Sequence, residues 1–152
     1  MEPIGSYIRR LPRTAAALAF GGATMAVTHL AWVPDARMNG AAPALTIAAG
    51  VAHALAGAIT GRRLLDGTRT RSSLQAGAVG ACTSLLAVVL FSPAFVLFVS
   101  ATDLQRSSAW SYLVLTVLTG VFSFLGAGWA LLLVSVGVGW GLYCVAVPQA
   151  PA

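Results

Sequence analysis

The chain has 152 residues, of which 58% are hydrophobic and only 9% are charged, and its formal net charge is +5. A soluble globular domain carries about a quarter of charged residues, so this composition excludes one. All nine basic residues are arginines, and they flank apolar segments, where arginine orients a protein in a membrane. We therefore predict no nucleic-acid partner.

Three apolar segments follow the N-terminus, and each is long enough to cross the hydrocarbon core of a bilayer. The first, 14–33, comes directly after basic residues, as in an uncleaved signal anchor. The second is 42–61, and the third is 74–100, in which Pro93 predicts a kink because proline removes a backbone donor. The segments do not alternate polar and apolar residues, so helices rather than barrel strands are predicted.

The last apolar segment, 110–147, contains no charged side chain. As one helix it would be about 57 Å long at 1.5 Å per residue, against a hydrocarbon core of about 30 Å. We therefore predict two short spans, 110–128 and 130–147, joined by a tight turn at residues 126–128. Two tryptophans nineteen residues apart in this segment match the spacing of interfacial aromatic belts. This arrangement favours five spans over four and places the C-terminus outside the cell.

These segments predict a polytopic, all-α integral membrane protein in which residues 1–152 form a single domain without a soluble part. Seven of the nine arginines precede the first span or lie in the 62–73 loop, and the other polar links hold one each. The positive-inside rule then places the N-terminus and this loop in the cytoplasm, with the protein in a bacterial cytoplasmic (inner) membrane. The loop arginines are also candidates for contact with anionic lipid headgroups or an acidic partner. They are Arg62, Arg63, Arg69 and Arg71.

The sequence contains no catalytic signature, no phosphate-binding glycine loop and no cluster of metal ligands, so we predict a protein that is not an enzyme and binds no metal. No acid and no arginine lies inside a predicted span. Because ion-coupled transporters use such residues near the middle of the membrane, this absence disfavours a pump or coupled antiporter.

Two histidines, His29 and His53, are the basic side chains inside the predicted spans, and such residues are candidates for function. At helical spacing His53 shares a face with Ala49 and Gly57, and small neighbours leave room for a flat tetrapyrrole. Haem or chlorophyll is therefore a candidate cofactor. The alternative is that His53 makes an interhelical hydrogen bond. The two histidines differ by about 10 Å in depth at 1.5 Å per residue, which disfavours one shared haem.

Small residues recur one turn apart on several predicted helices, a pattern that lets membrane helices pack closely. They outnumber the close contacts that one small bundle needs, so we predict that some face another chain. The leading hypothesis is a non-catalytic integral subunit that packs within and stabilises a larger membrane complex, with other integral subunits and lipids as partners. The helix-packing candidates are Gly50, Ala54, Gly57, Gly61, Gly77, Gly80, Gly137 and Gly141.

Two other hypotheses stay open, and neither involves a soluble substrate. The first is a tetrapyrrole-binding subunit of a photosynthetic or electron-transport complex that uses His53 and His29. The second is a small passive channel or carrier for a neutral solute, which would need a polar cavity. The candidate lining residues of that cavity are Thr24, Thr28, Thr46, Thr60, Thr83 and Ser84.

Overall fold

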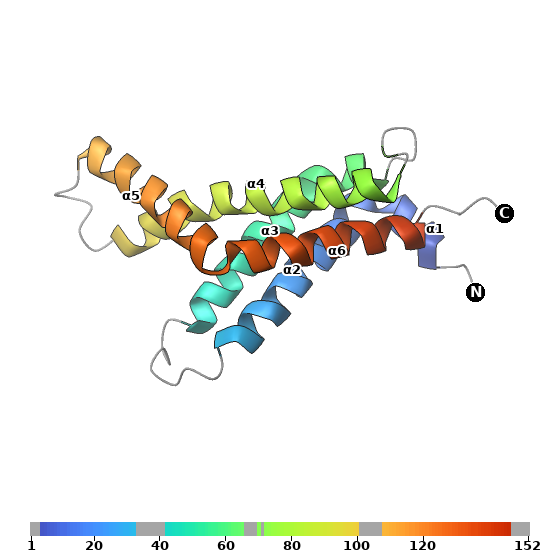
Figure 1. Ribbon diagram of the computed structural model, residues 1–152, viewed down its shortest axis with the longest axis horizontal. Coiled ribbons are helices and arrows are strands. Elements are labelled where there is room, and N and C mark those ends of the chain that lie inside the picture. Colours follow the sequence, from blue (N-terminus) through green and yellow to red (C-terminus); the bar gives the residue numbers. More distant parts are fainter. Residues whose placement is uncertain (1–3, 33–41, 66–69, 71, 101–107, 147–152) are drawn as a thin grey trace.

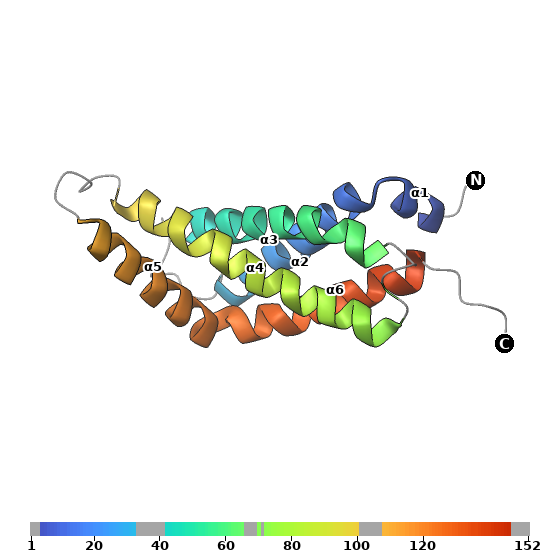
Figure 2. The same ribbon diagram turned by 90° about the horizontal axis from the view of Figure 1, so that it is seen from above.

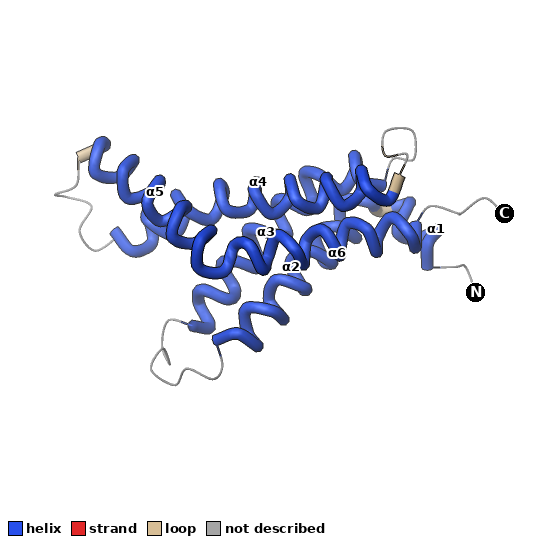
Figure 3. Tube along the Cα trace, in the orientation of Figure 1, coloured by secondary structure: helices blue, strands red, loops and turns tan. Residues whose placement is uncertain are grey.

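The computed structural model describes residues 4–32, 42–65, 70, 72–100 and 108–146. Helices are the regular elements of these ranges, and no strand occurs within them (Figure 3). The prediction of an all-α protein is confirmed. The elements are α1 (Ile4–Arg10), α2 (Pro12–Trp32), α3 (Ala42–Leu65), α4 (Ser73–Ser100), α5 (Ala109–Ser123), the π-helical η2 (Phe124–Gly128) and α6 (Trp129–Ala146).

Three helical stretches are long and apolar enough to cross a membrane: Ser73–Leu97, Ala109–Gly126 and Trp129–Ala146. The predicted spans 14–33 and 42–61 coincide with α2 and α3, which have 21 and 24 residues but are not among the three. The protein is therefore helical and compatible with membrane insertion, and the number of helices that cross stays a prediction.

Helices α2 and α3 form an antiparallel pair whose backbones approach closely (Figure 1). A Cβ atom added at Gly57 would lie 2.8 Å from the carbonyl oxygen of Ala16, and one added at Gly61 would lie 2.7 Å from that of Pro12. Only glycine allows this separation, because any side chain would push the helices apart. The small faces of α3 thus define where α2 packs.

A second close pair joins α4 to α6. A Cβ atom at Gly139 would lie 2.6 Å from the carbonyl oxygen of Ala76 and 3.1 Å from the Cα atom of Gly80. Helix α4 is also tied to α3, because the hydroxyls of Thr60 and Thr83 are 2.7 Å apart and share a hydrogen bond. The described helices therefore meet through small residues, and alanine dominates their buried core.

The predicted tight turn at residues 126–128 is wrong. Residues Phe124–Gly128 form a π-helix, and the flanking Ser123 (φ −62°, ψ −40°) and Trp129 (φ −64°, ψ −39°) keep right-handed helical geometry. The chain bends here without reversing, so α5 and α6 lie one after the other along α4 (Figures 1 and 2). The physical reason is that a helix pairs its own backbone groups, whereas a turn without polar residues leaves them unpaired in apolar surroundings.

This bend changes the predicted path of spans 110–128 and 130–147. Instead of returning towards the start of α5, helix α6 runs to the end of the bundle that holds α1, where Gly5 lies against the carbonyl group of Val145 (Figure 2). The prediction of an external C-terminus depended on the turn, so it loses its support.

The contact between α4 and α6 leads to a prediction with a matched control on the same helix. We expect Gly139→Ala to destabilise the fold by about 1–3 kcal/mol, because the added methyl group overpacks a backbone contact. Gly137→Ala, two residues away, should be neutral or slightly stabilising, because nothing lies within 4 Å of the added Cβ. Thermal unfolding of the two variants in the same detergent measures the difference, and equal midpoints would contradict the packing described.

Candidate functional site

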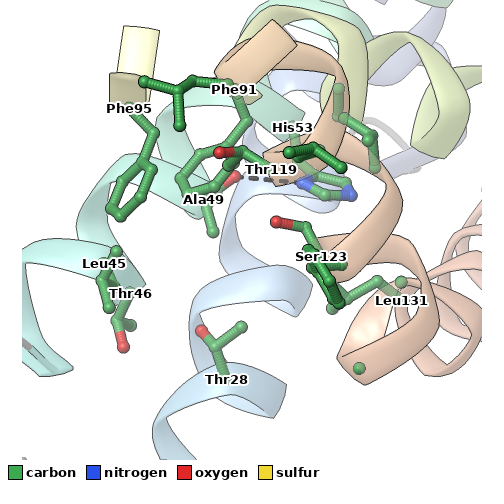
Figure 4. Close-up of a pocket in the computed structure, with 17 residues that line it drawn as sticks. Thr28, Leu45, Thr46, Ala49, His53, Phe91, Phe95, Thr119, Ser123 and Leu131 are labelled. Atoms are coloured by element: carbon green, nitrogen blue, oxygen red, sulfur yellow. Dashed lines mark hydrogen bonds between the residues drawn. The ribbon is translucent and has the colours of Figure 1, made fainter. Parts of the chain in front are cut away.

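A half-open cavity of about 740 Å³ lies where α5 diverges from the α2–α3 pair (Figure 4). Its walls come from α3 around residues 45–53, from α4 around 87–95, and from α5 and η2 between 115 and 128. Thr28 of α2 and Leu131 of α6 complete it. The cavity exists because the bend at η2 turns α5 away from α3 while keeping it against α4.

Among the described residues that line the cavity, His53 carries the one side chain that can gain or lose a proton near neutral pH. It is only 3% exposed, and its Nδ1 atom lies 3.0 Å from the carbonyl oxygen of Ala49, one helical turn earlier (Figure 4). Because a carbonyl oxygen can only accept, Nδ1 carries the proton and donates it. In the neutral imidazole Nε2 is then an unprotonated acceptor, and it is buried without a hydrogen-bond partner among the described residues. A buried acceptor without a donor costs about 1–3 kcal/mol.

The other polar groups of the cavity are hydroxyls. Thr28 donates to the carbonyl oxygen of Thr24 at 2.7 Å, so its proton is used within its own helix. Thr46, Thr119 and Ser123 add further hydroxyls to the wall. No charged side chain is among the described residues that line the cavity, and the remaining lining is apolar. The site is therefore suited to a neutral, largely apolar molecule.

Helix α5 forms the most weakly packed wall, since none of its residues is buried. It is tied to α4 by the hydroxyl of Tyr112, which donates to the carbonyl oxygen of Pro93 at 2.9 Å. The Oγ1 atom of Thr116 is buried with no hydrogen-bond partner in the described part of the chain. Loose packing of this kind, next to a π-helical bend, allows α5 to move relative to α3.

The two histidines predicted as cofactor ligands are not brought together. His53 lines the cavity, whereas His29 is exposed in the last turn of α2 and is not part of the lining. The Nε2 atom of His53 is also covered by neighbouring atoms. An axial ligand of haem or chlorophyll needs open space in front of the coordinating nitrogen, so coordination by His53 would require its neighbours to move, and the cofactor assignment stays a prediction.

The predicted helix-packing residues divide into two groups. Ala54 of α3 lies against Gly21 of α2, and Gly77 of α4 lies against Val136 of α6. Gly50 lies against the side chain of Met25. Gly57, Gly61 and Gly80 lie in the backbone contacts described above. By contrast, a Cβ atom at Gly137 or Gly141 would have no neighbour within 4 Å.

The hydroxyls predicted to line a channel do not share one cavity. Thr28 and Thr46 line the cavity beside His53, whereas the other four take part in helix packing. Thr83, for example, is fully buried and donates to the carbonyl oxygen of Val79 at 2.8 Å. The packed hydroxyl residues are Thr24, Thr60, Thr83 and Ser84.

Of the loop arginines, Arg62 and Arg63 are exposed at the end of α3, and Arg69 and Arg71 lie outside the described residues. Sequence reasoning missed the α5 side of the site, above all Thr119 and Ser123. Their signal was present, because hydroxyls four residues apart lie on one face of an otherwise apolar helix.

Over its described residues the protein is all-helical, with three helices apolar enough for a membrane and a half-open cavity without charged lining beside a buried histidine. Comparisons with family models, with curated proteins and with solved structures find no match to this chain.

Proposed function

We propose that the protein is an integral membrane protein that binds a neutral, apolar molecule in the cavity beside His53. The observation that carries this proposal is the combination of an apolar cavity of about 740 Å³ with a buried imidazole that has a free acceptor. The volume lies within the range of about 300–1,000 Å³ that is typical of small-molecule sites. Such sites are mostly apolar and contain a few polar groups that orient the ligand.

The bilayer is the natural source of this molecule. Leu115, Leu118 and Phe122 of α5 line the cavity and are also partly open to the surroundings of the bundle. In a membrane these surroundings are lipid, so an apolar molecule can reach the cavity from the side without crossing water. Binding of this kind fits the absence of charged residues from the described lining.

A cavity-filling variant tests the proposed binding. We expect Thr119→Trp, on the cavity wall, to remove most of any apolar molecule that co-purifies with the wild-type protein, because the indole occupies its space. Val117→Trp is the matched control, since Val117 lies on the same helix, is 56% exposed and does not line the cavity. Extraction and mass spectrometry of the bound molecules give the comparison. Retention of the same molecules in both variants would count against the cavity as their site.

A second candidate function is supported by small residues that do not pack against another described helix. Gly137 and Gly141 lie one turn apart on α6, and no atom of the described residues lies within 4 Å of a Cβ atom added at either. By contrast, α4 packs directly against Gly139, which lies between them in the sequence. Two glycines at this spacing let a helix of another chain approach closely. This supports a non-catalytic subunit of a larger membrane complex, and it is compatible with ligand binding at the cavity on another part of the surface.

The subunit proposal predicts an effect on native size. We expect the double variant Gly137→Leu, Gly141→Leu to lose association with partner chains in mild detergent, because two leucines prevent close approach of a second helix. Leu133→Ala on the same helix is the control, because it changes an exposed apolar residue without blocking that face. A wild-type protein that migrates alone, with no co-purifying subunit, would exclude this second function.

We further propose a location in a bacterial cytoplasmic membrane, with four crossings made by α2, α3, α4 and the continuous α5–η2–α6 helix. This last helix is longer than the hydrocarbon core, and its bend at η2 and ends that extend beyond the core accommodate the extra length. Charge supports the orientation, because Gly61, which precedes Arg62 and Arg63, packs against Arg13. These arginines therefore lie at one end of the bundle, and the positive-inside rule makes that end cytoplasmic. Gly5 of the N-terminal helix α1 contacts Val145, so the C-terminal end of α6 is proposed to lie on the cytoplasmic side as well.

Single cysteines at the two ends of the bundle test the orientation. In a background with Cys82 and Cys144 replaced by alanine, Ser72→Cys should be shielded from a membrane-impermeant maleimide in intact cells, and Ser108→Cys should react. Both serines are exposed and both accept a hydrogen bond from a backbone N–H three residues later, so the substitutions are matched. The reverse labelling pattern would invert the proposed topology.

A further inference from the structure

We infer that the ligand of the cavity is a neutral amphiphile with a hydroxyl group, an alcohol or phenol with a long or ring-bearing apolar body, whose O–H donates to Nε2 of His53. The inference rests on the proposed binding function and adds the chemical class of the molecule. It depends on hydrogen-bond direction, on charge and on the shape of the lining.

Hydrogen-bond direction comes from the fixed proton of the imidazole. Nδ1 donates to the carbonyl oxygen of Ala49, so in the neutral imidazole Nε2 can only accept. A ligand that satisfies Nε2 must therefore bring a donor. Ketones, esters and ethers offer acceptors alone and would leave the buried nitrogen unpaired, whereas an alcohol or phenol supplies the missing proton.

Charge restricts the head group further. The described lining contains no arginine, lysine or carboxylate that would pair with an ionised ligand. A carboxylate, phosphate or ammonium group placed beside His53 would lose its hydration without gaining a counter-ion. This argues against fatty acids and phospholipids and in favour of an uncharged head.

The apolar body of the ligand has a matching surface on α4 and α3. Phe91 and Phe95 stack on each other with ring centroids 5.5 Å apart and face the cavity together with Leu45 (Figure 4). These side chains form an apolar wall of the cavity, away from Ser123 at the C-terminal end of α5. A chain or ring system held against this wall leaves its hydroxyl free to approach the imidazole.

Access to Nε2 requires α5 to shift, because neighbouring atoms cover the nitrogen. The shift is feasible since α5 buries none of its residues, is joined to α6 through the π-helical bend, and contributes Thr119 and Ser123 to the cavity wall next to the imidazole (Figure 4). Tyr112 holds the opposite end of α5 against α4 through its hydrogen bond to Pro93. Binding would therefore displace the middle of α5 around these two attachments.

A matched pair of probes tests the inference directly. The full chain, labelled with ¹⁵N-histidine and placed in lipid nanodiscs, is titrated with 1-dodecanol or with dodecyl methyl ether, which has the same apolar chain but no donor. We expect the alcohol to move the Nε2 resonance of His53 and to bind roughly 2- to 10-fold more tightly than the ether, as one neutral hydrogen bond allows. His29 is the internal control, because it is exposed and lies outside the cavity lining.

Two variants show whether the preference for the alcohol comes from a hydrogen bond to residue 53 or only from the size of its side chain. His53→Phe should remove the preference for the alcohol while the ether still binds, because phenylalanine keeps an apolar ring without an acceptor. His53→Gln should keep part of the preference, since the amide oxygen can accept the hydroxyl proton. Helix content and thermal unfolding of both variants show that the fold is retained.

The outcomes distinguish the inference from the function on which it rests. Equal binding of the alcohol and the ether, with an unmoved Nε2 resonance, would overturn the hydroxyl assignment and leave ligand binding in place. Binding of neither probe, with both ring-nitrogen resonances of His53 unmoved, would overturn both. Loss of the alcohol preference in His53→Phe with retention in His53→Gln supports the assignment.

Discussion

The structure depends above all on the pairing of backbone groups within helices. A chain with so few charged side chains and such long apolar segments depends on its own helices to satisfy its N–H and C=O groups in apolar surroundings. This constraint explains why residues 124–128 remain helical even though they contain two glycines and no polar residue. The helix accommodates the required change of direction by widening to a π-helix, which bends the chain and keeps every turn hydrogen-bonded.

Close packing of small residues then decides the shape of the bundle. Lipid solvates leucine as well as protein does, so apolar side chains alone do not hold membrane helices together. Glycine and alanine instead let the backbones of α2 and α3, and of α4 and α6, come into contact. Helix α5 has no such partner across from α3, and the cavity opens at that place. The cavity therefore forms because no small-residue contact holds α5 against α3.

His53 and Thr116 are the described residues whose buried side-chain polar atoms lack a hydrogen-bond partner, and of the two His53 lines the cavity. Its Nδ1 proton is used by the backbone of its own helix, and its Nε2 atom is buried without a donor in the described part of the chain. Polar groups inside membranes are costly and are kept where they have a role. This nitrogen lies beside a cavity rather than between two packed helices, and that location favours a ligand as its partner.

The sequence by itself determined the helical class, the segments that form helices, the end of the bundle that carries arginine, and the choice of His53 as a candidate residue. These features follow from composition, from the length of apolar segments and from single residues, so they need no knowledge of neighbours. Only the tertiary structure decided that residues 126–128 bend rather than turn, that His29 lies apart from His53, and that no described residue packs against Gly137 and Gly141. It also brought Thr119 and Ser123 of α5 to the cavity that His53 lines. The reason is physical: helix direction at a π-helical bend and the pairing of small faces depend on contacts between distant segments, which periodicity along one chain does not contain.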